Sequence, residues 1–584
     1  MCGLVEFERA VQLKASIQVQ EANTIVPDSK PRVGLIPRSE ILRLSKKVFR
    51  FVGVVALLTG AAVWLQWRSG VYQAELNGYA DEAAHLITGL MVRDYLVSGL
   101  GQSPVKFAEN YYLHYPKVGF GIWPPMYHFV EAAWFLITPP GKISAFVLQA
   151  LITGTLGACV VWMALPYGWW IAVSAGLAFL GLPTVQIFTG MVMADNLMCL
   201  FSFFAMVAFL HYMETWKRRY LFLFGFLTGL ALMTKSNAAG LALLPVVALL
   251  LMKKPGKLLS WPMVGAAVLT LAVALPWQIL VMKLWTNATS ANRYSLEYML
   301  KMLWVHASMY ANLPGIVVFS LAIVGVLIRV VIPFRRGTLE PRWASVTGLV
   351  VGMFLFGLAP LPPEPRYHVA SLAGLTLFAA SALYEIRKLT ALRWGAAAGA
   401  AVVVSAGVLY GMTTFSIGKR EPVGYGEVAR QISGNPAYRK SVILVSSEAM
   451  GEGMLISEIA PLELRPSHYI LRATKMLARS RWNLDQYELL YPDEAKMQEF
   501  LESIPVRILV YDTAAGVMPM PHHQLLGKLI EKNPAKWRQV GIYPVAGTNS
   551  IGGQLKIYEL QGIDEKKKQS IKIDMRYTLQ RVLN

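Results

Sequence analysis

The sequence has few cysteines and few charged residues for its length. Three of its 584 residues are cysteine. Cys159 and Cys199 lie inside apolar runs and Cys2 is near the N-terminus, so neither a disulfide framework nor a thiolate metal site is suggested. Charged residues make up 15% of the chain, whereas a soluble domain needs about 25% to present a wetted surface. This composition excludes an ordinary soluble protein.

Apolar residues, at 55% of the chain, take the place of the missing charges. They gather in runs near the roughly 17–25 residues that cross a bilayer. The first run follows a long tail and has no small-residue cleavage site close after it, so we expect a spanning helix, not a signal peptide. There is no internal repeat and no low-complexity segment. The runs predict eleven spans, at residues 50–67, 143–164, 169–190, 194–212, 219–235, 237–252, 258–281, 313–334, 343–360, 368–385 and 393–413.

The net charge of +20 comes mostly from Lys and Arg in the tails and in short connections between apolar runs. This distribution indicates lipid headgroups as partners, and no nucleic acid. Eleven spans place every basic connection on the cytoplasmic side. These connections are the N-terminal tail and residues 217–219, 253–257, 335–342 and 387–393.

Residues 124–138 are apolar but are not predicted to span. They open with two prolines and carry Tyr127, His128 and Glu131. A carboxylate at mid-bilayer costs about 2.5–3.5 kcal/mol, and each good apolar residue returns only about 0.3–0.6 kcal/mol. Counting this segment as a span would also reverse the side of every later basic loop. We therefore expect a helix at the outer interface, within one external segment over residues 69–142.

After residue 413 the apolar runs shorten to strand length, at residues 442–445, 506–511 and 555–558. Helix-period stretches at 493–504 and 523–531 alternate with them, which predicts an α/β domain. The fold class expected is thus a polytopic α-helical membrane protein with a C-terminal extracytoplasmic α/β domain. Its parts would be a cytoplasmic basic tail (1–48), a transmembrane domain (49–413) and the α/β domain (414–584), whose Lys566-Lys567-Lys568 run is solvated or rests near headgroups.

The first group of candidate chemical residues follows the first span. Asp81 and His85 are four residues apart and share a helix face, with Glu82 turned away. One of the two carboxylates could act as general base on an acceptor hydroxyl. Alternatively, Asp81 caps the following helix and Glu82 lies near its positive end.

The second group combines His114 and Lys117 with the Pro-Pro-Met-Tyr-His sequence that contains Tyr127 and His128. Aromatic residues here could form an interfacial belt, although two histidines and a lysine exceed what a belt needs.

The third group consists of polar residues at the outer ends of spans. Asp195 opens one span, where nearby water could make it harmless, and Lys235 lies between two apolar helices. A cation at such a depth is a functional candidate. Arg366 offers a planar fork that suits a phosphate, or it pairs with Glu364. Because acids and cations converge on one side, transfer from a lipid phosphate is the chemistry they favour.

The ordered set of motifs resembles the polyprenyl-phosphate-dependent transferases of the GT-C fold. It is most similar to glycosyltransferase family 39, which includes protein O-mannosyltransferases and the lipid A aminoarabinose transferase. The resemblance covers most of residues 50–385 and rests on Asp81-Glu82, Pro124-Pro125-Met126-Tyr127, Asp195, Thr234-Lys235 and Arg366-Tyr367.

The resemblance implies an inverting transfer of a sugar from a polyprenyl-phosphate donor to an acceptor hydroxyl on a glycan, lipid or protein. It makes Asp81 the base, Glu82 and Asp195 parts of the acceptor or lipid-head pocket, and Lys235 and Arg366 the phosphate ligands. His85, His114 and Lys117 are additional candidates.

The resemblance further implies that no nucleotide sugar is needed, and the chain has no nucleotide-binding loop. Related oligosaccharyltransferases use a divalent metal, for which Asp81, Glu82 and His85 would be the ligand set here. The C-terminal region does not look like the insertion of the eukaryotic mannosyltransferases, which favours a bacterial enzyme of the inner membrane that acts on the periplasmic or exterior side.

Two other classes are compatible with a many-span chain. A transporter or flippase of lipid-linked substrates usually shows repeats and ionisable groups at mid-membrane, whereas the candidates here are at the outer ends. A scaffold that recruits partners has no need of Asp81, Lys235 and Arg366 on one side.

Overall fold

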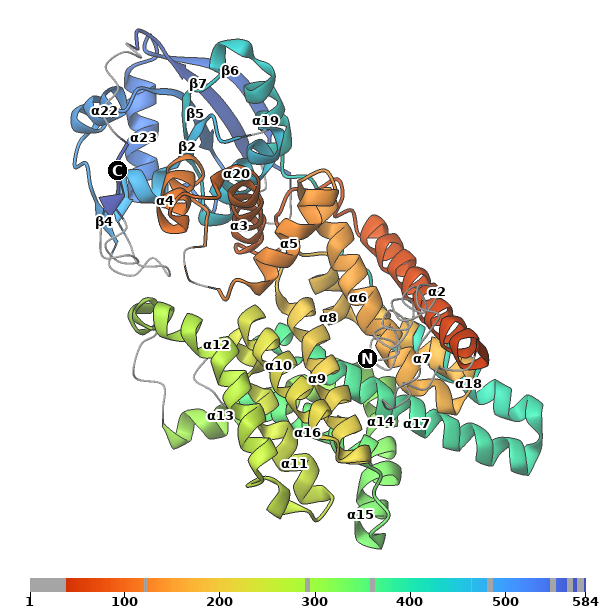
Figure 1. Ribbon diagram of the computed structural model, residues 1–584. Helices are drawn as coiled ribbons and strands as arrows, with labels where there is room; N and C mark the ends of the chain where they lie inside the picture. The colour runs from red at the N-terminus through yellow and green to blue at the C-terminus, as the bar shows by residue number, and fades with distance from the viewer. Residues whose placement is uncertain are drawn as a thin grey trace, which may run out of the picture.

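The computed structural model describes residues 38–119, 121, 123–288, 295–357, 363–463, 465–479, 487–546, 553–563, 571–574 and 582–583. Pro362, the tail before Arg38 and the Lys566–Lys568 run lie outside them. Figure 1 shows a bundle of long helices with a sheet-containing region at one end. The chain is a multipass membrane protein, because several of these helices are long and apolar enough to cross a bilayer.

The helices of the membrane region follow one another with short connections. They are α2 (Arg38–Arg68), α3 (Glu82–Asp94), α4 (Pro104–His114), α5 (Met126–Ile137), α6 (Lys142–Ala164), α7 (Trp169–Gly181), α8 (Pro183–Thr189), α9 (Asp195–Thr215), α10 (Arg218–Thr234), α11 (Leu243–Leu251), α12 (Trp261–Ala288), α13 (Leu296–Asn312), α14 (Gly315–Val326), α15 (Ile332–Arg336), α16 (Pro341–Phe356), α17 (Val369–Trp394) and α18 (Ala396–Thr413).

All eleven predicted spans are helical, but the count of eleven crossings is not confirmed. Within the described residues, seven helices are long and apolar enough to cross, and an eighth crossing arises if α7 and α8, bent by 66°, form one broken span. The other three predicted spans coincide with α10, with the stretch Ser236–Leu251 and with α16. The 17 residues of α10 rise only about 25 Å, which is less than the hydrocarbon thickness. The apolar runs predict full crossings, but polar breaks end these three helices before they reach that length.

Glycines allow the shorter helices to pack closely. A Cβ on Gly240 would lie 2.8 Å from the backbone oxygen of Gly352, and one on Gly352 would lie 2.4 Å from that of Gly240. The backbone before α11 therefore touches α16 directly. In membranes, helices usually associate where small residues let their backbones approach closely. Burying an apolar side chain contributes little there, because lipid is as apolar as the protein interior.

The helix α5 has the expected short length, at 12 residues, and begins directly after Pro125. It packs against α3, with Glu131 fully buried. A Cβ on Gly89 of α3 would lie 2.2 Å from Glu131 Oε2, so only glycine leaves room for this carboxyl. Burial raises the pKa of Glu131 well above its usual range, which favours the neutral acid. The carboxyl is thus accommodated between helices and not in lipid.

The connections divide between two ends of the bundle. At one end, Lys254 Nζ lies 4.6 Å from the Trp216 ring and Lys253 Nζ lies 5.3 Å from the Phe334 ring, so three predicted cytoplasmic connections meet. At the other end, the backbone amide of Arg420 donates to the Ser69 carbonyl at 2.7 Å. The segment after α2 and the linker after α18 therefore share an end.

The C-terminal region contains the expected strands and helices. Its elements are α19 (Tyr425–Gly434), β1 (Val442–Ser446), α20 (Ala449–Ile459), β2 (Tyr469–Arg472), α21 (Ala473–Met476), β3 (Ala478–Arg479), β4 (Glu488–Leu489), α22 (Glu494–Ser503), β5 (Val506–Asp512), α23 (Pro521–Lys532), β6 (Trp537–Pro544), β7 (Gln554–Leu560), β8 (Ile573–Asp574) and β9 (Val582–Leu583).

The main sheet has the order β2-β1-β5-β7-β6. The strand β1 pairs in parallel with β2 and β5, and β7 pairs antiparallel with β5 and β6. All five residues of β1 are buried, which is the pattern of a central strand covered on both faces.

Polar contacts join this region to the segment after α2. The Glu75 carboxylate accepts hydrogen bonds from the backbone amides of Val423, Gly424 and Gly426 at 2.6–3.0 Å, where α19 begins. A carboxylate at a helix N-terminus is stabilised by the helix dipole and by amides that have no partner inside the helix.

The two ends of the bundle can be distinguished by labelling. In a cysteine-free background, we expect K106C and E427C to react with an impermeant maleimide from one side of the membrane. R336C and K254C should react only from the opposite side, because all four side chains are exposed and the two pairs lie at different ends. Labelling of K106C and R336C from the same side would contradict this topology.

Candidate active site

Four breaks between helices bring polar side chains to the end of the bundle that faces the C-terminal region. Asp81 directly precedes α3, Asp195 opens α9, Lys235 separates α10 from the next turn, and Arg366 lies in the turn Pro365–His368 before α17. These four predicted site residues lie close enough together to influence one another's charge.

Asp195 and Lys235 form a buried ion pair. Lys235 Nζ lies 2.6 Å from Asp195 Oδ1, and the Asp195 side chain is fully buried. Lys235 has an extended backbone that interrupts two apolar helices, and Asp195 lies in the first turn of α9, where a negative charge is favourable. Asp195 is therefore buried and paired, and it is not a water-exposed residue at a helix end.

Arg366 lies among several weaker partners. Its Nη2 donates to the Tyr79 hydroxyl at 3.3 Å, its Nε lies 3.4 Å from Glu364 Oε2, and its Nη1 lies 3.9 Å from Asp81 Oδ2. The predicted pairing with Glu364 is thus present, but it does not saturate the guanidinium. The Tyr367 ring lies near both cations, 5.6 Å from Lys235 Nζ and 5.7 Å from the Arg366 guanidinium.

The adjacent acids Asp81 and Glu82 have opposite surroundings. Asp81 holds the N-cap position of α3 without capping it, and within the described residues its carboxylate accepts no hydrogen bond. Burial raises the pKa of Asp81, while the cations of Arg366, Lys235 and Lys117 act in the opposite direction. A carboxyl with a raised pKa and no fixed donor is suited to accept a proton.

Glu82, in contrast, is fully buried and surrounded by donors. Its Oε2 accepts from the amides of Gly78 at 2.7 Å and Tyr79 at 3.0 Å, and its Oε1 accepts from the amide of Val192 at 3.0 Å. Arg420 places both terminal nitrogens 3.2–3.3 Å from the carboxylate. These contacts favour a role in holding the loop in place.

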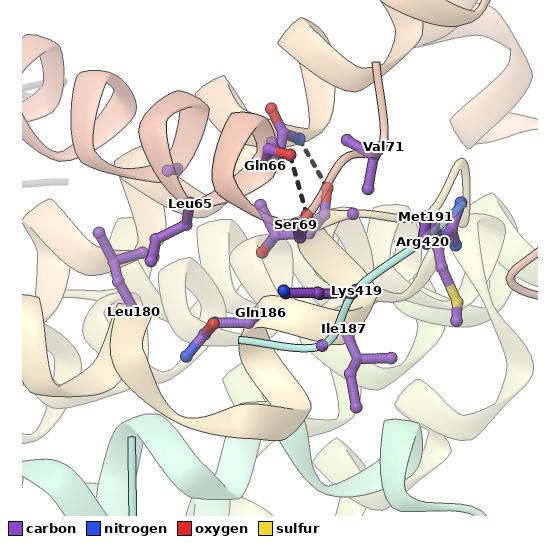
Figure 2. Close-up of a pocket in the computed structure, with 14 residues that line it drawn as sticks. Leu65, Gln66, Ser69, Val71, Leu180, Gln186, Ile187, Met191, Lys419 and Arg420 are labelled. Atoms are coloured by element: carbon purple, nitrogen blue, oxygen red, sulfur yellow. Dashed lines mark hydrogen bonds between the residues drawn. The ribbon is translucent and has the colours of Figure 1, made fainter. Parts of the chain in front are cut away.

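Arg420 was not identified from the sequence. It follows α18 on the side of the membrane where the predicted spans leave few positive charges, and that signal could have found it. Its guanidinium also borders a cavity of about 180 Å³ between α2, α8 and the linker. Figure 2 shows Lys419 extending into this cavity, with Leu65, Leu180 and Ile187 around it.

Two further predicted residues lie near this cluster. Lys117 is buried, and its Nζ donates to the carbonyl of Ala80 at 3.1 Å, beside Asp81. Tyr127 is fully buried and its hydroxyl accepts from Gln149 Nε2 at 2.8 Å. His114 lies elsewhere: its Nδ1 is 3.0 Å from the carbonyl oxygen of His468, and its ring stacks on Tyr469 of β2.

His85 pairs with a second histidine instead of with Asp81. Its Nδ1 lies 3.0 Å from His128 Nε2, so one imidazole donates and the other accepts. Burial lowers the pKa of His128 to about 3 and that of His85 well below its usual value, which keeps both rings neutral.

The residues suggested for a divalent metal do not converge. Glu82 is bound by Arg420 and backbone amides, and His85 faces His128. In the described part of the chain, no three His, Cys, Asp or Glu side chains are grouped as metal ligands.

Comparisons with known proteins find one family match and several structures of similar fold. Residues 123–279, which include Tyr127, Asp195 and Lys235, match the family described as dolichyl-phosphate-mannose-protein mannosyltransferase. The crystal structure of ArnT from Cupriavidus metallidurans bound to undecaprenyl phosphate has a TM-score of 0.51 at 13% identity and covers 89% of this chain and 99% of that chain. The apo structure of the same ArnT gives a TM-score of 0.52 with the same identity and coverage. The chain has the GT-C fold.

The GT-C fold was the fold expected from the ordered motifs. A third solved structure, archaeal AglB from Archaeoglobus fulgidus in complex with an inhibitory peptide and a dolichol-phosphate, gives a TM-score of 0.48 at 11% identity and covers 89% of this chain and 75% of that chain. A comparison with curated protein sequences finds no match. The family match and the fold agree with the predicted transferase and do not favour a transporter.

The contrast between the two adjacent acids predicts different stabilities. We expect E82A to lose about 3–5 kcal/mol of stability, because Arg420 and three amides lose their buried acceptor. D81N should change stability by less than about 1 kcal/mol, because no hydrogen bond is lost. The unfolding midpoint in detergent measures both, with E82Q as an intermediate control. Equal losses in D81N and E82A would contradict the assignment.

Proposed function

We propose that the chain is a membrane glycosyltransferase that moves a sugar from a polyprenyl-phosphate-linked donor to an acceptor hydroxyl. The observation that carries this proposal is the Asp81 carboxylate, which has no hydrogen-bond donor among the described residues and lies beside two cations, Arg366 and Lys235. A base and cations in one cluster suit displacement of a phosphate leaving group, because the base takes the acceptor proton and the cations stabilise the leaving charge.

In the proposed reaction, the acceptor hydroxyl gives its proton to Asp81 as its oxygen bonds to the anomeric carbon of the donor. The bond from that carbon to the lipid phosphate breaks, and its electron pair stays on the phosphate oxygen. The negative charge of the leaving phosphate is then stabilised by Arg366 and Lys235. Attack from the face opposite the phosphate inverts the configuration at the anomeric carbon.

The neighbours of the two cations keep them in place before the donor binds. Asp195 holds the Lys235 ammonium at 2.6 Å, while Arg366 has only contacts of 3.3–3.9 Å. A phosphate can displace these weaker contacts, because charge-assisted hydrogen bonds to a guanidinium are shorter and often bidentate.

We also propose that catalysis occurs outside the cytoplasm, at a bacterial inner membrane. The basic connections that carry Lys254 and Arg336 lie at the opposite end of the bundle from Asp81, and Lys and Arg favour cytoplasmic loops. On this arrangement, residues 49–413 form the catalytic membrane domain and residues 414–584 face the periplasm or exterior. The sheet region then covers the site from the water side.

Transfer of a labelled sugar from a polyprenyl-phosphate donor, measured in proteoliposomes, tests the function. D81N should lower kcat about 10²–10⁴-fold, because the acceptor hydroxyl loses its base. K235A and R366A should each lower it about 10²–10³-fold, because the phosphate charge is less stabilised.

The matched control is K106A, which removes an exposed lysine of the same external segment and should leave the rate unchanged. Gel filtration of each variant establishes that it is folded. Transfer that survives all three site substitutions would refute the assigned roles. Failure of the folded wild-type protein to transfer sugar from any polyprenyl-phosphate donor would refute the function itself.

A further inference from the structure

The C-terminal region reaches the candidate active site through α20. This helix packs against α3, and Figure 1 shows the two side by side. The contact is closest at Gly453, where an added Cβ would lie 2.6 Å from Lys117 Cε and 3.1 Å from Ala83 Cβ. The side chain of Lys117 therefore lies directly against the backbone of α20.

The other end of Lys117 reaches the residue before the proposed base. Its ammonium donates to the Ala80 carbonyl at 3.1 Å, and its side chain is almost wholly buried. Lys117 thus links the C-terminal region to the backbone that carries Asp81. This lysine is positioned by contacts on both sides and not by its own loop alone.

A buried ion pair of the C-terminal region lies next to this lysine. The Glu452 carboxylate is fully buried and accepts from Arg472 Nε at 2.7 Å and from the amide of Thr474 at 2.9 Å. Arg472 Nη1 also donates to the carbonyl of Pro116 at 3.4 Å, one residue before Lys117. The pair therefore holds the loop as well as contributing charge.

Four charged groups from four elements act on the Lys117 ammonium. They are Asp81 before α3, Glu452 on α20, Arg472 at the end of β2 and Lys475 on α21. Burial and the two cations lower the pKa of Lys117 to about 7, and the two carboxylates act against that decrease. Near neutral pH, small changes in these neighbours alter the fraction of Lys117 that is charged.

We propose that Glu452, Gly453 and Arg472 are positioning residues of the catalytic centre, which hold Lys117 beside Asp81 and set how much of this lysine is protonated. That Lys117 lies beside the bound donor rests on the proposed function. The donor is a phosphodiester with a single negative charge, which favours the charged form of Lys117, so donor binding takes up a proton from solvent. The C-terminal region then acts as part of the active site.

The proposal predicts shifts of opposite sign in the pH profile of kcat/KM. E452Q removes a negative charge, so Lys117 loses its proton at lower pH and the alkaline limb moves to lower pH by about one unit. R472Q removes a positive charge and leaves Glu452 unpaired, so the alkaline limb moves to higher pH by about one unit. A purely structural role for the pair would lower activity without shifts in opposite directions.

Replacing Lys117 by arginine shows whether the shifts come from this side chain. In a K117R background the side chain stays charged at every pH tested, so neither E452Q nor R472Q should shift the pH profile of kcat/KM. Equal shifts in the presence and absence of Lys117, or shifts of E452Q and R472Q in the same direction, would overturn the proposal.

A second variant tests position without altering charge. G453A places a methyl group against the flexible end of Lys117, so the fold should be retained while kcat/KM falls about tenfold. G434A is the matched control, because no atom lies within 4 Å of its added Cβ, and its kcat/KM should equal that of the wild type. Wild-type kcat/KM in a folded G453A protein would contradict the positioning role.

A measurement that does not depend on sugar transfer tests this inference separately from the proposed function. The carbon-13 NMR shift of the Lys117 Cε methylene, followed across pH, reports the protonation of this buried side chain directly. Opposite shifts in E452Q and R472Q without any sugar transfer would support the positioning and refute the proposed function. Unchanged titration of Lys117 in a protein that does transfer sugar would refute the positioning alone.

Discussion

The arrangement of this candidate site depends on the contacts that the Glu82 carboxylate makes. The carboxylate accepts hydrogen bonds from the turn before α3, from the turn before α9 and from Arg420 in the linker after α18. A buried charge is tolerated only when donors surround it, so these three segments are held together at one point. Because Asp81 is the neighbouring residue, fixing Glu82 also fixes the proposed base near Arg366.

The same breaks that shorten the helices also build the site. The bend between α7 and α8, the extended residue Lys235 after α10 and the turn before α17 all lie at one end of the bundle. Irregular backbone at the level of a membrane is tolerated where protein or water covers it. The C-terminal region supplies that cover, through α20 and the contacts of Glu75 with α19.

Several site residues could be found from the sequence because each breaks a local rule of membrane proteins. Asp195 and Lys235 interrupt apolar helices, and Arg366 is a cation on the side with few cations. The structure brings all three to Asp81. Glu452 breaks no such rule, because charged residues are ordinary in a water-exposed region. Only its burial shows that it matters.

For two of the predictions, the local sequence pattern did not indicate the surroundings of the side chain. Asp81 and Glu82 look alike in the sequence, yet Glu82 is surrounded by donors and Asp81 is not, because Val192 and Arg420 approach from distant segments. His114, also predicted as a site residue, lies against β2 of the C-terminal region, a contact that the sequence does not indicate. A contact between two side chains that are far apart in the chain produces no periodic pattern in the sequence around either residue.

The sequence by itself determined that this is a many-helix membrane protein with a strand-containing C-terminal region, since hydrocarbon thickness and strand period act on local runs. It also placed the cations at helix ends, because a buried charge in lipid is costly. Only the tertiary structure decided which acid is free to accept a proton and which lysine the C-terminal region holds, since desolvation and donor contacts depend on how the elements pack.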